Sequence, residues 1–263
     1  MNAATGLVLD IGNTSCRIAR YANGKITQRR DFSSSNDANG REFFKKIMSH
    51  SRSFAPFDDK KNDMVVAIAS VASPEPTAFY INLFPPATVR VISGDMPGLP
   101  LKFAPGFTQK EKIGADRLAN AMGAIALKKH PCVIADFGTA LTVDGVNEKG
   151  EFIGGMILPG MATLLRAMHQ NTARLPELNV PPKPFSKPFG QNTKDAMLAG
   201  VEHGYRGLVR ETVETLQRAL CGKCALLATG GMATRVATAS GLEFEINPDL
   251  TLLGIAQVLT HIT

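Results

Sequence analysis

The sequence contains no tryptophan and only three tyrosines among its 263 residues. Its basic residues occur as scattered doublets, such as Arg29 with Arg30 and Lys128 with Lys129, and aromatic residues are not interleaved with them. Surfaces that bind nucleic acid usually combine clustered basic groups with aromatic side chains on which bases stack. The formal net charge of +6 therefore does not favour nucleic-acid binding, whereas a positive field suits small anionic ligands.

Cysteine is also scarce, with four residues spread over the chain. Their number and spacing exclude a disulfide scaffold and favour reduced thiols in a cytoplasmic protein. Cys221 and Cys224 form one CxxC pair, but a structural zinc site needs four ligands and the sequence offers no second pair. We therefore expect neither a zinc site nor a redox pair.

Long hydrophobic runs are missing as well. Residues 1–6 carry no basic flank and lead into a short apolar stretch, so we expect neither a signal peptide nor an anchor. Apolar stretches such as 152–165 are interrupted by Gly and Pro, whereas a membrane-spanning helix needs roughly 20 apolar residues. The 44% hydrophobic content is enough for one large domain or two modest ones.

The chain contains an internal repeat. An apolar run, an Asp, one apolar residue and a Gly occupy residues 7–12 and again residues 133–138. Each copy is followed by a hydroxyl residue, Thr14 or Thr139, one position out of register. Strand-hairpin-strand patterns come next, with turns at residues 23–24 and 147–150. Such a duplication predicts that each half forms a similar unit.

The remaining pattern alternates helices and strands in both halves. We expect α/β architecture in which each half forms a mixed sheet with helices on its faces, and the two sheets face a shared ligand cleft. The expected domains are residues 1–117 and 118–263, and the last helix, residues 250–261, is expected to pack back on the first domain. Prolines make residues 179–188 an exposed excursion that borders the site. The expected helices are 41–50, 75–83, 161–169, 194–220 and 232–239, and the later strands are 64–69, 88–92, 225–228 and 243–246.

Two repeated acidic strand ends are the first candidates for chemistry. Asp10 to Thr14 could offer a carboxylate for Mg²⁺ and backbone N–H groups for phosphate. Alone, this pattern is more often an ordinary turn. The duplicate at Asp136 to Thr139 supplies a second carboxylate and hydroxyl, as expected if a triphosphate binds between two sheets.

Two further segments allow two interpretations each. Asp116 lies where a helix begins and could accept a hydroxyl proton, or it could be a helix-start Asp paired with Arg117. Thr229, Gly230 and Gly231 follow an apolar strand and could contact a nucleoside or phosphate, or form a simple turn into the next helix.

Taken together, the motifs resemble those of type III pantothenate kinases over nearly the whole chain. DIGNT at 10–14, GADR at 114–117, DFGTALTVD at 136–144, GGMILPG at 154–160 and QNT at 191–193 occur in the order and approximate spacing of that family. TGG at 229–231 and NPDLTLLG at 247–254 also look like it. The resemblance implies a homodimer of the acetate kinase, sugar kinase, Hsp70 and actin superfold. In that fold the α/β chain forms duplicated actin-like (ribonuclease H-like) domains, each a mixed five-stranded sheet with helices, with the ligand cleft between them. It also implies phosphorylation of pantothenate to 4'-phosphopantothenate, the first step of coenzyme A biosynthesis.

The same resemblance implies the role of each residue. Asp116 would be the proton acceptor, and Asp136 would bind the monovalent cation, K⁺ or NH₄⁺, beside an ATP that carries Mg²⁺. The ATP-binding residues would be Asp10, Ile11, Gly12, Asn13, Thr14, Ser15, Cys16, Arg17 and Thr139. The residues that contact pantothenate would be Phe107, Gly114, Ala115, Asp116, Arg117 and Thr193.

The chain departs from the family pattern in two places. Phe107 stands where the family usually has Tyr, so a hydroxyl contact to the substrate is missing or comes from another group. Ser15 and Cys16 differ from the polar residues common after DIGNT. Two alternatives stay open: a non-catalytic regulatory relative with the same fold, and a kinase for another small alcohol, such as a sugar kinase.

Overall fold

The computed structural model describes residues 5–33, 42 and 65–260. By its internal contacts the chain forms two compact units, residues 1–129 with 249–263, and residues 130–248. The expected boundary after residue 117 lies inside the helix α3, which packs against α7 of the first unit. The expected helix at 41–50 lies outside the described residues except for Glu42.

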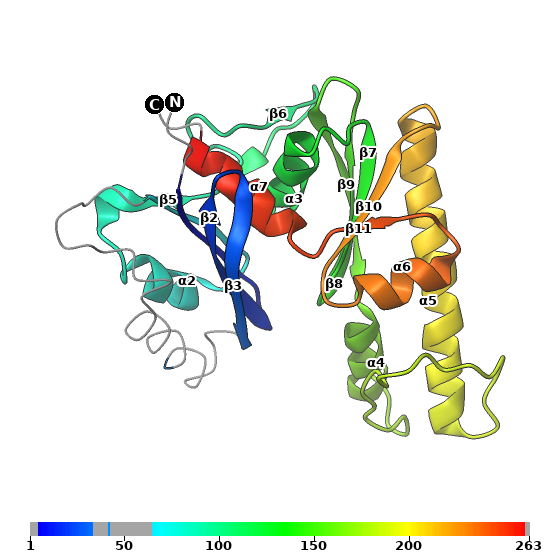
Figure 1. Cartoon of the computed structure of the whole chain (residues 1–263). Coiled ribbons are helices and arrows are strands. Elements are labelled where there is room, and N and C mark those ends of the chain that lie inside the picture. Colours follow the sequence, from blue (N-terminus) through cyan, green and yellow to red (C-terminus); the bar gives the residue numbers. More distant parts are fainter. Residues whose placement is uncertain (1–4, 34–41, 43–64, 261–263) are drawn as a thin grey trace. The chain divides into compact units, whose positions relative to one another are not determined.

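The first unit is built on a mixed sheet of five strands in the order β3-β2-β1-β4-β5 (Figure 1). Strands β1 to β3 are antiparallel, and β4 and β5 continue the sheet parallel to β1. The elements are β1 (Gly6–Ile11), β2 (Ser15–Ala22), β3 (Lys25–Ser33), β4 (Val65–Ser70), α2 (Pro74–Ile81), β5 (Val89–Val91), β6 (Lys102–Phe103), α3 (Ala115–Ala126) and α7 (Leu250–Thr260). Short 3-10 helices occupy Pro86–Thr88 and Lys110–Lys112.

The second unit repeats this arrangement. Its strands follow the order β9-β8-β7-β10-β11, in which β7 to β9 are antiparallel and β10 and β11 continue the sheet parallel to β7. The predicted duplication is thereby confirmed. The second unit contributes five strands to its sheet, as expected. Its elements are β7 (Cys132–Phe137), β8 (Ala140–Val146), β9 (Glu151–Pro159), α4 (Met161–Gln170), α5 (Thr193–Ala219), β10 (Ala225–Thr229), α6 (Ala233–Ser240) and β11 (Glu245–Ile246).

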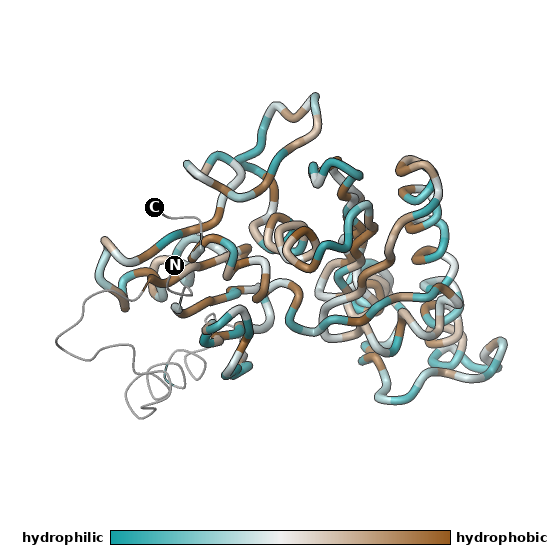
Figure 2. Tube along the Cα trace, turned by 45° about the horizontal axis from the view of Figure 1, so that its top comes forward, coloured by the Kyte–Doolittle hydropathy of each residue, from teal (hydrophilic) through white to brown (hydrophobic). Residues whose placement is uncertain are grey.

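Both cores follow from strand alternation. In the first unit Leu7, Leu9 and Ile11 project from β1 into an apolar cluster that includes Tyr80 of α2. Side chains at the intervening positions, among them Asp10, lie on the other face. In Figure 2 hydrophobic residues concentrate along the interior strands, whereas exposed loops are largely polar. Along the described residues, no helix combines the length and apolarity needed to cross a membrane.

Two glycines let α3 and α7 approach each other closely. A Cβ at Gly254 would lie 1.7 Å from the carbonyl oxygen of Ala119, and one at Gly123 would lie 2.4 Å from that of Leu250. Only glycine permits such backbone contact. The register of α7 on α3 is therefore tightly specified, and α7 also packs on β1 and β4.

Candidate active site

A row of charged side chains crosses three strands of the first sheet. Asp10 at the carboxyl end of β1 is paired with Arg17 of β2, and Arg17 is paired with Asp31 of β3. Residues paired across neighbouring strands point to the same face. The face opposite the α2 core therefore presents a positive group between two negative ones.

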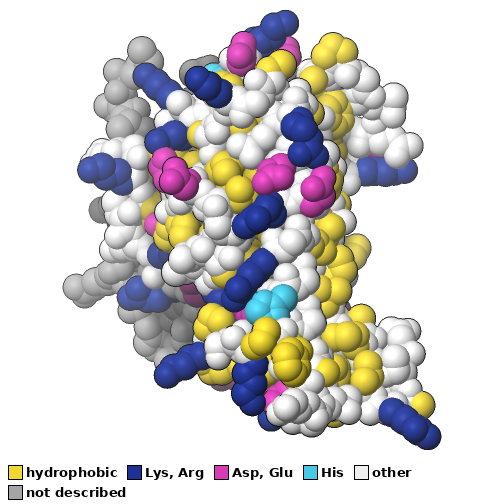
Figure 3. Space-filling model, turned by 90° about the vertical axis from the view of Figure 1, so that its right-hand side faces the viewer, with side chains coloured by type: hydrophobic (Ala, Val, Ile, Leu, Met, Phe, Trp, Pro, Cys, Tyr) yellow, Lys and Arg dark blue, Asp and Glu magenta, His cyan; other side chains and the backbone are white. Residues whose placement is uncertain are grey.

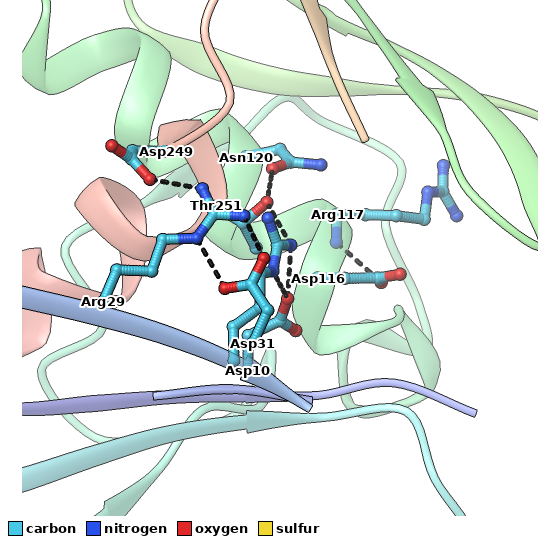
Figure 4. Close-up of polar contacts among 9 residues, drawn as sticks. Asp10, Arg29, Asp31, Asp116, Arg117, Asn120, Asp249 and Thr251 are labelled. Atoms are coloured by element: carbon cyan, nitrogen blue, oxygen red, sulfur yellow. Dashed lines mark hydrogen bonds and ion pairs between the residues drawn. The ribbon is translucent and has the colours of Figure 1, made fainter. Parts of the chain in front are cut away.

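Arg17 is bound directly to Asp10. Its Nε donates to Asp10 Oδ2 at 2.8 Å, and its Nη2 also donates to this oxygen. Nη2 further donates to Thr251 Oγ1 at 3.2 Å. Figure 4 shows Asp10 and Thr251 near Asp116 and Asn120 of α3. The buried carboxylate of Asp10 is thus neutralised by a largely buried guanidinium, as a buried charge requires.

Asp116 lies in the first turn of α3, and its Oδ1 accepts the backbone N–H of Arg117 at 2.8 Å. Burial raises the pKa of the Asp116 carboxyl; the Arg117 N–H opposes this, and the negative charge of Asp10 adds to the rise. A Cβ at Gly114 would lie 2.6 Å from Asp116 Oδ1, so a side chain there would displace the carboxyl from its present position. A carboxyl with a raised pKa beside a second carboxylate is typical of a functional site.

The hairpin between β1 and β2 forms the tip of this site. Gly12 N donates to the carbonyl oxygen of Ser15 at 3.0 Å, and a Cβ at Gly12 would lie 2.8 Å from the same oxygen. Asn13, Thr14 and Ser15 are exposed at the tip. Ile11 and Cys16 are buried in the core, so only their backbones could reach a ligand.

The second unit has a corresponding acidic strand end. Asp136 of β7 is paired with Thr142 of β8 and with Thr229 of β10. Gly230 has φ +92°, and a Cβ there would lie 2.5 Å from Asp136 Oδ1. The Thr229 hydroxyl is buried and has no hydrogen-bond partner among the described residues. A carboxylate, two hydroxyls and close backbone are therefore gathered at one point of this sheet.

The second hairpin is one residue shorter than the first, because Gly138 N donates to Ala140 O, and this explains why the two hydroxyls are out of register. Thr139 is exposed at its tip, and its carbonyl oxygen accepts from Thr163 Oγ1 and from Gly160 N. These contacts tie the hairpin to the start of α4.

The other two residues expected to contact the substrate, Phe107 and Thr193, belong to different units. Phe107 of the first unit is half-buried and lies 5.3 Å from Phe103 between ring centroids. Thr193 is the first residue of α5 in the second unit, and it lines an apolar groove between α4 and α5. Asp10, Arg17, Asp116 and the 114–117 turn come together in the first unit, while Asp136 and Thr139 come together in the second.

Five residues near this site were given no role from the sequence. Thr251 donates to Asn120 Oδ1 at 2.8 Å, and both are buried. Arg29 donates to Asp31 at 2.6 and 2.7 Å and to Asp249 at 2.6 Å. One signal was available: Asn120 lies one turn after Asp116, so it faces the same side of α3.

Comparison with known proteins shows the family of the chain. The family model described as type III pantothenate kinase matches residues 6–215. A type III pantothenate kinase from Dehalococcoides mccartyi is 32% identical over 252 residues, which cover 95% of each chain.

Solved structures share the fold. A conserved protein assigned to the Baf family of transcriptional activators, from Campylobacter jejuni, has a TM-score of 0.59 at 18% identity and covers 97% of each chain. The activator of 2-hydroxyisocaproyl-CoA dehydratase from Clostridium difficile, with bound ADPNP, has a TM-score of 0.53 at 14% identity over 98% of this chain and 94% of its own. The expected duplicated, actin-like α/β fold is confirmed.

Proposed function

This chain belongs to the type III pantothenate kinase family, and we propose that it transfers the γ-phosphoryl group of ATP to the primary hydroxyl of pantothenate. The product would be 4'-phosphopantothenate, which enters coenzyme A biosynthesis. The observation that carries the proposal is the Asp116 carboxyl, with its raised pKa, beside the Asp10–Arg17 pair within a family match that spans both.

The hairpin of the first unit fits the phosphates of ATP. Gly12 keeps side-chain bulk away from the hairpin, and the exposed tip residues offer backbone N–H groups and hydroxyls. Ile11 and Cys16 would contribute only backbone groups. Arg17, with its fork of donors, would bind phosphate oxygens.

The second strand end fits a monovalent cation. A carboxylate from Asp136 and the buried, unpartnered hydroxyl of Thr229 are oxygen ligands on adjacent strands. Thr139 at the neighbouring hairpin tip would join the phosphates. When bound, Mg²⁺ and K⁺ or NH₄⁺ would neutralise phosphate charge as it shifts during transfer.

Asp116 would act as the proton acceptor for the substrate hydroxyl. Its raised pKa makes it a stronger base than an exposed Asp, and the adjacent Gly114 to Arg117 turn would contact the pantothenate. Phosphoryl transfer through a loose transition state depends mainly on positioning and charge. Arg17 and the hairpin would therefore do more for the rate than the base does.

A homodimer in the cytoplasm completes the proposal. The groove between α4 and α5 has a volume of about 470 Å³ and is lined mainly by apolar side chains, and Figure 3 shows hydrophobic side chains gathered in the lower part of the face that carries α5. A second copy of the chain would cover such a surface. All four cysteines are free, which suits a reducing compartment.

The decisive experiment supplies ATP, Mg²⁺ and K⁺ with pantothenate, glycerol, glucose or acetate, and identifies phosphorylated products by mass spectrometry. We expect phosphopantothenate alone, and none from the Asp116→Asn variant over the same short time. Phosphorylation of glycerol or glucose instead would identify a different alcohol kinase. Absence of any product from a folded protein would favour the regulatory alternative.

A further inference from the structure

The first turn of α7 brings a hydroxyl to Arg17 from a distant part of the sequence. Thr251 is completely buried, and 234 residues separate it from Arg17, whose Nη2 donates to its Oγ1 at 3.2 Å. Figure 4 shows Thr251 bonded to Asn120. Arg17 is thus held from two sides, by Asp10 and by Thr251.

The direction of these hydrogen bonds is determined by chemistry. A guanidinium can only donate, so the Thr251 oxygen accepts from Arg17. The single hydroxyl proton of Thr251 is then available for Asn120 Oδ1, at 2.8 Å. Asn120 therefore orients the hydroxyl so that its lone pairs face Arg17.

The backbone contacts of α7 keep this hydroxyl in place. The close contacts of Gly123 with Leu250 and of Gly254 with Ala119 flank the Asn120–Thr251 pair on both helices. On the other side, Arg29 of β3 holds Asp249, the residue before α7, at 2.6 Å. A shift of α7 would break these contacts together, so the position of Thr251 is well specified.

We propose that Thr251 is a positioning residue for the nucleotide: oriented by Asn120, its hydroxyl holds the Arg17 guanidinium ready to meet the phosphates of ATP. This inference rests on the proposed function, in which Arg17 binds phosphate. A side chain ordered before binding loses less conformational entropy when the ligand arrives. Removing the hydroxyl should then weaken ATP binding with little effect on later steps.

The test compares Thr251→Val, which keeps the shape, with Thr251→Ser, which keeps the hydroxyl. Calorimetry with Mg·ATP alone should show affinity weakened about 3- to 10-fold for Val and unchanged within about 2-fold for Ser, as for loss of part of a charge-assisted bond. In steady-state assays Val should raise KM for ATP by the same factor and leave kcat and KM for pantothenate nearly unchanged. Thr260→Val, at the exposed end of the same helix, is the control and should match the wild type.

A second measurement separates positioning from simple destabilisation. In an Arg17→Lys background, Thr251→Val should weaken Mg·ATP binding by less than 2-fold, because the two changes remove the same contact. If Thr251→Val does not fold, Thr251→Ala takes its place in both backgrounds.

Several results would overturn the inference: wild-type affinity in the Val variant, tighter binding in it, a Ser variant that behaves like Val, or full additivity with Arg17→Lys. Wild-type protein that binds no Mg·ATP would end both proposals. Wild-type protein that binds Mg·ATP without phosphorylating pantothenate would end only the proposed function, because calorimetry still tests Thr251.

Discussion

Burial of the Asp116 carboxyl affects both the stability of the protein and the ability of this group to accept a proton. Its pKa is raised mainly by burial, so ionising this carboxyl costs more free energy in the folded state than in the unfolded chain. The free energy of unfolding of the wild type therefore falls as pH rises from the ordinary Asp pKa of 3.8 through the raised pKa of Asp116. The same raised pKa favours proton acceptance from an alcohol.

We predict that Asp116→Asn lowers kcat by about 10²–10⁴-fold, the usual worth of general-base assistance. The variant should resist urea better than the wild type at pH 7, because it lacks the buried charge, and the difference should vanish below the ordinary pKa of Asp, 3.8. Steady-state kinetics and urea titrations at both pH values check this. Glu111→Gln, which changes an exposed carboxylate upstream, should alter neither quantity; wild-type turnover in Asp116→Asn would remove Asp116 from the role.

At the second strand end, we predict that activity collapses when Na⁺ replaces K⁺. Thr229→Val should raise the K⁺ concentration for half-maximal rate several-fold. It removes a hydroxyl that has no hydrogen-bond partner among the described residues and that lies opposite Asp136 on the neighbouring strand. Rates at varied K⁺ and constant ionic strength provide the measurement. Equal rates in K⁺ and Na⁺ would contradict the cation assignment at Asp136.

At the scale of elements, the proline-rich segment 179–188 is held by one buried carboxylate. Glu202 of α5 accepts from Arg235 of α6 at 2.5 Å and from the backbone of Phe185, and Arg235 also donates to the carbonyl oxygen of Pro181. Burial alone would raise the pKa of Glu202, but the bonds and charge of Arg235 lower it overall. A segment without regular structure is thereby fixed to two helices.

We predict that Arg235→Leu destabilises the protein by about 3 kcal/mol, because it leaves a buried carboxylate without its main partner. Trypsin should then cut faster after Lys183 and Lys187. Since Glu202 has a lowered pKa, its stabilising effect is present at neutral pH and is lost as pH falls through that pKa.

Urea titration and timed proteolysis measure both effects. Arg218→Leu, which breaks an exposed ion pair on α5, should cost at most about 0.5 kcal/mol. Equal stability of the two variants would show that the Glu202 contacts do not hold the segment.

At the scale of the whole molecule, α5 carries glycines whose presence packing within the chain does not explain. A Cβ at Gly200 or Gly204 would meet nothing within 4 Å, and both residues line the apolar groove. Glycine within a helix costs about 1 kcal/mol relative to Ala. Close approach of a second chain would account for them.

We predict that Gly204→Glu converts a dimer to a folded monomer, because a charge enters the groove without clashing inside the chain. Light scattering coupled to gel filtration should show half the wild-type mass, and circular dichroism should be unchanged. Gly204→Ala, which adds only a methyl group, should stay dimeric and gain helix stability. A wild-type protein that is monomeric at micromolar concentration would refute the homodimer.

Much of the fold could be predicted from local pattern. The apolar run with its terminal Asp, repeated at Asp10 and Asp136, indicated two equivalent strands, and the hairpin turns indicated antiparallel partners. Strand ends were less accurate: the segment expected at 88–92 forms only Val89–Val91, and 243–246 forms only Glu245–Ile246. Edge strands are short because fewer neighbours support their ends.

The sequence by itself determined the duplicated pattern of strands and the motifs that mark Asp10, Asp116 and Asp136, because each depends on spacing within one segment. Only the tertiary structure decided that Thr251 and Asn120, 131 residues apart, would support Arg17, and that Arg29 would hold Asp249. Such partners leave no periodic signal, because helix packing brings them together. Burial also decided which candidate residues can offer a ligand only their backbone groups. Cys16 is one of them, because its side chain belongs to the apolar core.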